Sequence, residues 1–305
     1  MIQNMSADAA YSSCCASCGI AEVVVPCDDC DLVRYCGDEC QNNHKLQHEE
    51  ACKKRAAELR EELLFKQPES SHHGDCPICS LPLPLDKSKG TIYHCCSKII
   101  CKGCDITNQW RQFGQGLVIS CPFCRKPAPR TREEYDGRNM KRIEANDPVA
   151  LWQEGKKEYD KGDFDRAFEY WTKAAELGDA DAHFKLAELY HFGRGVEKDK
   201  EKYIYHLEVA AIGGHPHARY NLGGAEWNSD NIEKAVRHWI IAARQGDDEA
   251  IKELMEAFKE GYVEKDILAV ALRAHHAAVD ATKSPQREAA EEFHRRKREG
   301  YYEQD

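Results

Sequence analysis

The cysteines are the residues of this sequence whose type and spacing could do chemistry. All 16 lie between Cys14 and Cys124 of a 305-residue chain, and most stand two or three residues from a partner. Zn²⁺ takes four nitrogen or sulfur ligands at tetrahedral angles, and two residues separated by a tight turn supply half of such a site. The N-terminus has neither the basic start nor the apolar stretch of a secretory signal. We therefore expect an intracellular location, cytoplasmic or nuclear, and thiolates held by metal rather than disulfides.

The first group of candidate ligands lies between residues 15 and 52. It consists of four pairs: Cys15 and Cys18, Cys27 and Cys30, Cys36 and Cys40, and His48 and Cys52. Four pairs supply two complete zinc sites. The segment falls just under the roughly 40 residues below which a domain usually needs metal or disulfides. Structural zinc contributes about 10–16 kcal/mol in finger peptides, which is enough to fold so small a unit.

The pattern CASC…CDDC…YCGDECQNNHKLQHEEAC resembles the MYND zinc finger, in which the pairs interleave. The resemblance implies one zinc on Cys15, Cys18, Cys36 and Cys40 and another on Cys27, Cys30, His48 and Cys52. Tyr35 and Gln41 stand where the family has an aromatic residue and a Gln. The family commonly has Trp after its first His, whereas here His44 is followed by Lys45. The sequence therefore departs from the family in the groove that binds peptides.

A second group of four pairs lies between residues 76 and 124: Cys76 and Cys79, Cys95 and Cys96, Cys101 and Cys104, and Cys121 and Cys124. It resembles an all-cysteine variant of the RING finger, which is also cross-braced. The resemblance implies one zinc on Cys76, Cys79, Cys101 and Cys104 and another on Cys95, Cys96, Cys121 and Cys124. The common RING form has a His two residues after a Cys, but Lys98 fills that position here, so Cys95 completes the pair. The alternative pairs His94 with Cys96.

Together the two groups predict four Zn²⁺ per chain, held by His48 and every cysteine except Cys14. In ubiquitin-ligase RING fingers, four further residues contact the ubiquitin-conjugating enzyme or ubiquitin. The corresponding residues here are Ile78, Trp110, Pro122 and Arg125. A RING finger positions a charged conjugate and needs no nucleophile of its own, so no catalytic residue is expected.

The rest of the chain consists of helix-forming segments and a linker. Residues 53–68 contain strong helix formers without Gly or Pro before Pro68, which predicts a linker helix that continues from the first group. Residues 125–146 are basic and polar and contain Pro, which predicts a linker. Residues 282–305 predict a charged helical tail that frays.

Residues 147–281 repeat themselves. Ala pairs recur every 32 to 36 residues, at 174–175, 210–211, 242–243 and 277–278, and a Gly follows each of the first three. Two helices per period form a helical hairpin repeat. The phrases YWTKAAELGDADA and LYHFGRGVEKD resemble Sel-one-like repeats, a tetratricopeptide-type array. The resemblance implies a non-catalytic α-solenoid that binds proteins on its concave face, while its Trp residues at helical spacing are expected in the core.

Charge and hydropathy argue against two classes of function. The formal net charge of −10 argues against nucleic acid, which needs clustered Lys and Arg, and no run of about 18 apolar residues suggests a membrane helix. The sequence predicts a multidomain protein in which two small cross-braced zinc-binding domains precede an all-α helical-repeat domain. Its partners are expected to be proteins. Two functions stay open: a RING-type ubiquitin-protein ligase that recruits substrate through the MYND-like finger and the repeats, or a non-enzymatic zinc-binding scaffold.

Overall fold

The computed structural model describes residues 25–27, 34–35 and 38–299, and the chain divides into two compact units, residues 1–66 and 67–305. In the first unit, β1 (Val25–Pro26) pairs antiparallel with β2 (Arg34–Tyr35), and α1 (Asp38–Leu64) follows. The helix α1 runs without a break through most of the predicted linker helix 53–68. It ends at Leu64, four residues before Pro68.

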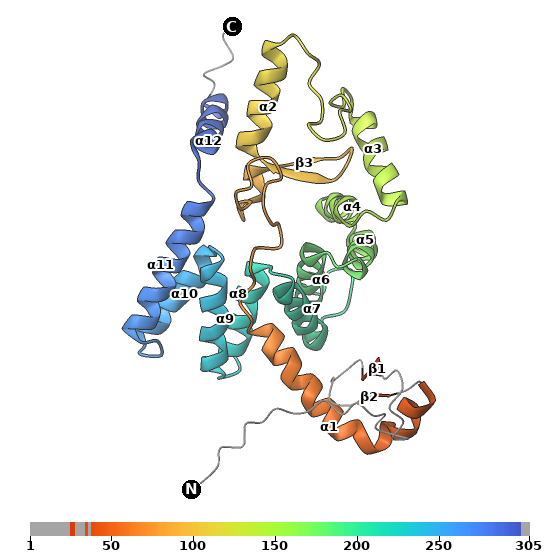
Figure 1. The fold of residues 1–305 in the computed structure, drawn as a ribbon, viewed down its shortest axis with the longest axis vertical. Helices are drawn as coiled ribbons and strands as arrows, with labels where there is room; N and C mark the ends of the chain where they lie inside the picture. The colour runs from red at the N-terminus through yellow and green to blue at the C-terminus, as the bar shows by residue number, and fades with distance from the viewer. Residues whose placement is uncertain (1–24, 28–33, 36–37, 300–305) are drawn as a thin grey trace. The chain divides into compact units, whose positions relative to one another are not determined.

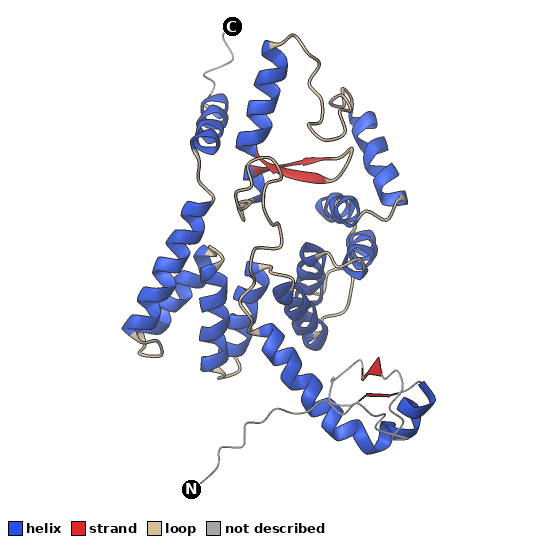
Figure 2. Cartoon of the chain, viewed as in Figure 1, coloured by secondary structure: helices blue, strands red, loops and turns tan. Residues whose placement is uncertain are grey.

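The second unit begins with the second cysteine-rich segment, residues 76–124, which we call the second finger. Its two strands, β3 (Gly90–Tyr93) and β4 (Lys98–Cys101), form an antiparallel hairpin in which Thr91 lies opposite Ile100. The short helix η1 (Lys87–Lys89) precedes the hairpin and α2 (Lys102–Gly114) follows it (Figure 2). The core of the finger is small and centres on Leu83, Ile100 and buried cysteines.

Eight consecutive helices form the predicted repeats. They are α4 (Pro148–Asp160), α5 (Phe164–Glu176), α6 (Ala180–Phe192), α7 (Lys200–Ile212), α8 (Pro216–Trp227), α9 (Ile232–Arg244), α10 (Asp248–Lys259) and α11 (Lys265–Ala281). Helix α4 packs on α5, α6 on α7, and α8 on α9. Gly178, Gly214 and Gly246 each have φ between 83° and 88°, which only Gly adopts readily. The predicted fold class, cysteine-rich domains before a helical solenoid, is confirmed.

The Trp side chains hold the paired helices together, as their helical spacing predicts. Trp171 is 1% exposed, and its Nε1 donates to the Trp152 carbonyl at 3.1 Å. Two repeats later, Trp239 donates to the Tyr220 carbonyl at 3.2 Å. Each ring packs where the facing helix has a Gly: a Cβ on Gly223 would lie 2.3 Å from Trp239 Nε1. Close approach of paired helices therefore depends on these glycines.

The prediction of a basic linker over residues 125–146 is corrected by the structure, because most of this segment forms α3 (Arg132–Glu144). Thr131 begins the helix by accepting the Glu134 N–H at 3.2 Å, the capping role that Thr commonly plays. Helix α3 packs on α4, and the buried Asn139 donates to Glu154 Oε2 at 3.2 Å. The charged composition concealed a helix whose inner face combines the polar Asn139 with Ile143, which packs against the core of the repeats.

The predicted tail contains α12 (Pro285–Arg298), which packs against α2. Helices α3 to α12 form an arc, and the second finger lies inside it (Figure 1). The finger contacts both halves of the arc, through Lys87 Nζ on Asp181 Oδ1 at 2.7 Å and through Arg287 on the Pro82 carbonyl at 2.7 Å. Part of the inner face that the repeats were expected to offer to partners is thus covered by this chain. Among the described residues, no helix combines the length and the apolar character needed to cross a membrane.

We predict that Gly223→Ala destabilises the repeats. The new methyl group would overlap the Trp239 ring, and overpacking costs about 1–3 kcal/mol, against about 1 kcal/mol gained in helix propensity. The adjacent Gly224, where a Cβ meets nothing within 4 Å, is the matched control. Gly224→Ala should be neutral or stabilising by up to about 1 kcal/mol, and chemical denaturation measures both. Equal effects of the two substitutions would contradict the close packing.

Candidate functional site

The first four-cysteine cluster of the second finger gathers residues from three elements. The Sγ atoms of Cys76, Cys79, Cys101 and Cys104 lie within 4.8 Å of one another. Cys79 Sγ and Cys101 Sγ are 3.8 Å apart. Cys101 ends β4 and caps α2, so the hairpin and the helix place Cys101 and Cys104 opposite the Cys76–Cys79 turn. These are the four residues that the sequence grouped for one zinc.

The second cluster consists of Cys95, Cys96, Cys121 and Cys124, whose Sγ atoms also lie within 4.8 Å of one another. Cys96 Sγ and Cys121 Sγ are 3.7 Å apart. His94, the alternative to Cys95, lies outside this group: its Nδ1 is 2.9 Å from Gln153 Oε1, and its ring contacts Tyr135 at a tilted angle, with centroids 4.0 Å apart. The geometry therefore favours the Cys95–Cys96 pair.

Two equivalent Cys-Pro-x-Cys turns hold the outer pairs. The amide of the residue after each turn donates back to the first cysteine, Ser80 N to the Cys76 carbonyl at 2.8 Å and Arg125 N to the Cys121 carbonyl at 3.0 Å. Both donors adopt left-handed backbone conformations, with φ of 54° at Ser80 and 60° at Arg125. Such conformations cost a non-Gly residue roughly 1–2 kcal/mol. Each turn directs both of its sulfurs to one side, as a tetrahedral site requires.

The electrostatics of these clusters call for a cation. Burial raises the pKa of the Cys104 thiol, and the Cys101 sulfur beside it adds to the effect. Burial would also raise the pKa of Cys76, but backbone N–H groups, first that of Cys101, outweigh it and lower the pKa to about 7. Four neighbouring sulfurs cannot all ionise unless a positive charge offsets their repulsion. An all-sulfur tetrahedral donor set fits Zn²⁺.

The first unit supplies a partial site. Cys27 Sγ, Cys52 Sγ and a ring nitrogen of His48 lie within 4.8 Å of one another. His48 and Cys52 stand four residues apart on α1 and so share one face of the helix. Burial and the neighbouring His44 lower the pKa of His48, which favours the neutral imidazole that binds metal. The fourth predicted ligand, Cys30, lies outside the described residues, as do Cys15, Cys18 and Cys36 of the site that includes Cys40.

The four residues predicted to contact a conjugating enzyme differ in exposure. Ile78 is 45% exposed and Trp110 is 52% exposed, Arg125 is exposed, and Pro122 is half-buried. One neighbour was not foreseen: the Phe293 ring of α12 meets Trp110 edge-on, with centroids 5.5 Å apart. Helix α12 thus shares the surface of α2 on which Trp110 lies.

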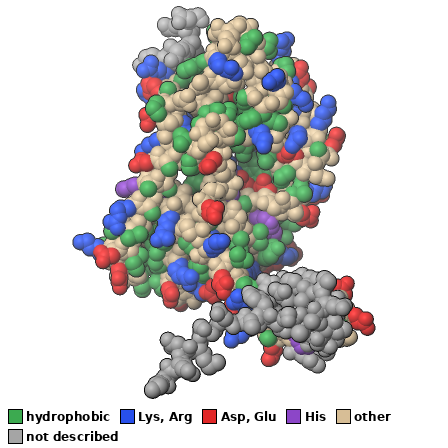
Figure 3. Space-filling model, in the orientation of Figure 1, with side chains coloured by type: hydrophobic (Ala, Val, Ile, Leu, Met, Phe, Trp, Pro, Cys, Tyr) green, Lys and Arg blue, Asp and Glu red, His purple; other side chains and the backbone are tan. Residues whose placement is uncertain are grey.

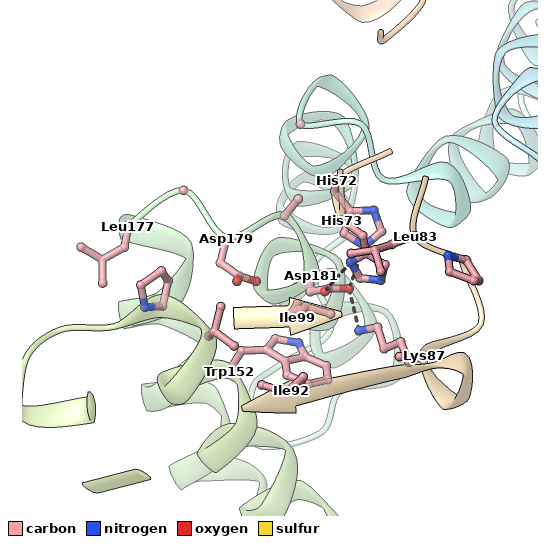
Figure 4. A pocket seen from close by; sticks show the side chains of 17 residues that line it. His72, His73, Leu83, Lys87, Ile92, Ile99, Trp152, Leu177, Asp179 and Asp181 are labelled. Atoms are coloured by element: carbon pink, nitrogen blue, oxygen red, sulfur yellow. Dashed lines mark hydrogen bonds and ion pairs between the residues drawn. The ribbon is translucent and has the colours of Figure 1, made fainter. Parts of the chain in front are cut away.

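Asp181 of α6 fastens the second finger to the repeats (Figure 4). Its Oδ1 lies 2.7 Å from Lys87 Nζ and 3.3 Å from both His72 Nε2 and His215 Nε2. Burial alone would raise the pKa of Asp181, but His215 and the Lys87 ammonium hold it well below its ordinary value. His215 Nδ1 accepts the Ala218 N–H, so the proton is on Nε2, which donates to Asp181 and is unsuited to metal.

A cavity of about 280 Å³ adjoins this carboxylate. The finger contributes Leu83, Ile92 and Ile99 to its wall, and the repeats contribute Trp152 and Leu177 (Figure 4). The Lys87 ammonium lies 3.9 Å from the centre of the Trp152 ring, a cation–π contact across the same boundary. The boundary between finger and repeats therefore combines apolar packing with a partly exposed ion pair.

Comparisons with known proteins identify two modules. Residues 15–52 match the MYND finger, and residues 150–179, 180–215 and 216–247 match the Sel1 repeat. The chain therefore contains a MYND finger, which implies zinc binding, and three Sel1 repeats. Together these modules support a zinc-binding adaptor for protein–protein interactions.

Individual relatives match only part of the chain. An uncharacterised protein of Neisseria meningitidis serogroup B is 31% identical over 99 residues, which are 30% of this chain and 20% of that protein. A Sel1 repeat protein from Oxalobacter formigenes has a TM-score of 0.43 and 24% identity, over 58% of this chain and 73% of that one. A protective antigen of uropathogenic Escherichia coli strains, which displays an SLR fold, has a TM-score of 0.39 and 18% identity, over 63% and 41%.

We predict four zinc ions per chain, because the ligands form eight pairs and each site takes two. Elemental analysis of protein purified without chelators measures the count. Cys101→Ser should hold about three ions, since it removes one of four ligands from a single site. Cys14→Ser is the matched control and should keep all four. A count of about two in the wild type would mean that one of the two fingers does not bind zinc.

The second prediction concerns pH. Burial lowers the pKa of His215 to about 4, against an ordinary value of 6.5, despite the opposing effect of Asp181. Between these values the unfolded chain binds a proton that the folded chain does not, so this group makes stability rise with pH. Asn retains the helix cap but cannot titrate. His215→Asn should therefore lower the pH slope of the unfolding free energy between pH 5 and 6.5, by up to about 1.4 kcal/mol per pH unit. Denaturant titrations at several pH values measure it, and an unchanged slope would contradict the assignment.

Proposed function

We propose that this protein is a zinc-binding adaptor that acts as a RING-type ubiquitin-protein ligase. In this proposal the second finger holds a ubiquitin-conjugating enzyme, while the MYND finger and the repeats recruit the substrate. The observation that carries it is the cross-braced arrangement of two four-cysteine clusters, built from alternating pairs. Such a finger needs no chemistry of its own, because it restrains a charged conjugate in its reactive geometry.

The surface of the second finger supports this proposal. Ile78 projects from the first Cys-Pro-x-Cys turn and remains 45% exposed, although the cysteine that precedes the turn's proline is fully buried. Arg125 ends the second turn, where its left-handed backbone is fixed by the hydrogen bond to Cys121. An exposed apolar anchor beside a fixed cation suits a partner that offers both an apolar patch and a charged edge. On the face drawn in Figure 3, Lys and Arg are interspersed with Asp and Glu, which suits protein partners better than nucleic acid.

The second candidate is a non-enzymatic scaffold in which the fingers and the repeats only bind proteins. One observation favours it: Phe293 of α12 packs against Trp110, a residue that the ligase would use to bind its conjugating enzyme. An aromatic residue already in contact within the chain is less available to a partner. The two candidates differ in whether the protein transfers ubiquitin, which an assay with purified components decides.

We predict that Ile78→Ala reduces ubiquitin transfer by roughly 30-fold or more, the effect of removing an interface anchor worth about 2 kcal/mol. The substitution removes an exposed side chain that is not a metal ligand, so the zinc content should stay the same. Ubiquitin transfer is measured with a panel of conjugating enzymes. The variant Cys101→Ser should lose one zinc ion and ubiquitin transfer together. A wild type that transfers no ubiquitin with any enzyme of a broad panel leaves the scaffold as the function.

Arg125→Ala tests the positioning role separately. It should slow transfer by up to about a hundredfold, as loss of one transition-state donor typically does. Binding of the conjugating enzyme should change little, because the proposed contacts of Arg125 form mainly with the ubiquitin conjugate. The adjacent and equally exposed Lys126 offers the matched control, and Lys126→Ala should leave the rate unchanged. Equal losses in both variants would mean that only the total charge matters.

A further inference from the structure

Arg287, in the first turn of α12, reaches the first four-cysteine cluster. Its side chain is buried, 5% exposed, and its guanidinium donates to four acceptors. Nη1 donates to the carbonyls of Pro82 at 2.7 Å and Thr282 at 2.6 Å. Nη2 donates to the Leu81 carbonyl at 3.2 Å and to Cys79 Sγ at 3.4 Å. A buried cation from the C-terminal helix thus contacts a sulfur that is one of the predicted zinc ligands.

The backbone of the finger is shaped to receive this helix. A Cβ on Gly103 would lie 2.9 Å from both the Arg287 nitrogen and the Gln286 carbonyl carbon, so only Gly permits the approach. Lys89 Nζ lies 2.9 Å from Glu291 Oε1, and Phe293 packs on Trp110. The contacts follow α12 for two turns. They come from η1, from α2 and from the residues in and just after the first cysteine turn.

The charge of the cluster links the Arg287 contact to metal binding. Zn²⁺ with four thiolates carries a net charge of about −2, and an N–H···S bond from a guanidinium lowers that charge locally. A metal ion on these four sulfurs would hold the first cysteine turn in place, and Cys79 Sγ and the carbonyls of Leu81 and Pro82 in and beside this turn are three of the four acceptors of Arg287. Without metal the turn would lose that restraint, and the buried Arg287 cation would lose acceptors, which costs free energy. Metal binding and docking of α12 therefore favour each other, and such coupling is reciprocal.

We propose that α12 is a zinc-dependent latch on the second finger, and that Arg287 couples it to the site formed by Cys76, Cys79, Cys101 and Cys104. The proposal rests on zinc binding by the second finger, which is part of the proposed function. Arg287 is a positioning residue: it orients the Cys79 sulfur and fastens the last helix of the arc. When the latch is closed, Phe293 covers one edge of Trp110. The metal state of the finger therefore also sets how much of that surface a partner meets.

The test measures metal retention and helix protection on the full-length protein. Residues that orient metal ligands typically change affinity by 10–100-fold. In competition with a chromophoric chelator, Arg287→Ala should release one zinc per chain 10–100-fold more readily, while the other ions are held as in the wild type. Hydrogen exchange should show α12 protected in the zinc-loaded wild type and unprotected in Arg287→Ala or after chelation. Arg298→Ala, an exposed arginine of the same helix, is the matched control and should change neither.

A second variant covers the case in which Arg287→Ala fails to fold. Gly103→Ala removes no ligand and no charge, but its methyl group displaces the start of α12, so it should also weaken retention of one zinc and expose α12. A full zinc count with retention unchanged in both variants would overturn the latch and leave the zinc-binding finger intact. A wild type that holds no zinc in the second finger would overturn the latch together with the zinc premise of the proposed function.

Discussion

The mutual repulsion of clustered thiolates is the constraint on which the second finger depends. Its apolar core consists of little more than Leu83 and Ile100 among buried cysteines, which is too little to fold a domain of this size alone. The buried sulfurs of Cys76, Cys101 and Cys104 are therefore part of the core, and their ionisation calls for a cation nearby. The backbone yields to this requirement at Ser80 and Arg125, where non-Gly residues adopt left-handed conformations so that both outer pairs can face a common centre. Under the proposed zinc binding, metal binding and folding of this segment are coupled.

Polar contacts also attach the second finger to the arc of helices on two sides. Asp181 binds Lys87 on one side, and Arg287 binds Cys79 and nearby carbonyls on the other. A finger held at both sides gives up part of the solenoid's inner face as a partner surface. Other surfaces of the repeats remain: a cavity of about 780 Å³ on helices α6 to α9 is lined by aromatic residues, among them Tyr190, Tyr203, Tyr220 and Trp227. Aromatic residues of this kind are enriched where proteins bind each other.

How much of this could be predicted from the sequence depends on the distance over which each signal acts. Ligand pairs and helix periodicity are local, so the spacing of the cysteines indicated the pairs, and the spacing of Trp171 and Trp239 indicated a core role. Which pairs would meet was implied by the resemblance to the RING finger. Helix α3 was missed because its inner face mixes the polar Asn139, which donates to Glu154, with Tyr135 and Ile143, and so leaves no continuous apolar stripe in the sequence. Arg287 was missed for a related reason. In a segment rich in Arg and Glu, nothing local distinguishes the one arginine that is buried, since its partners Leu81 and Pro82 lie some two hundred residues earlier in the chain.

The attachment of the second finger to the repeats fixes the separation between whatever each of them binds. Under the ligase proposal, a substrate bound by the repeats and a conjugating enzyme bound by the finger would be carried on one compact unit, residues 67–305. Transfer between groups held at a fixed separation avoids much of the entropy cost of bringing them together. A flexible linker between finger and repeats, as the composition of residues 125–146 suggested, would give up part of that advantage. The helix α3, packed on α4 where a linker was expected, and the buried Arg287 on the other side make the geometry rigid, so the orientation of a bound substrate becomes a property of the fold.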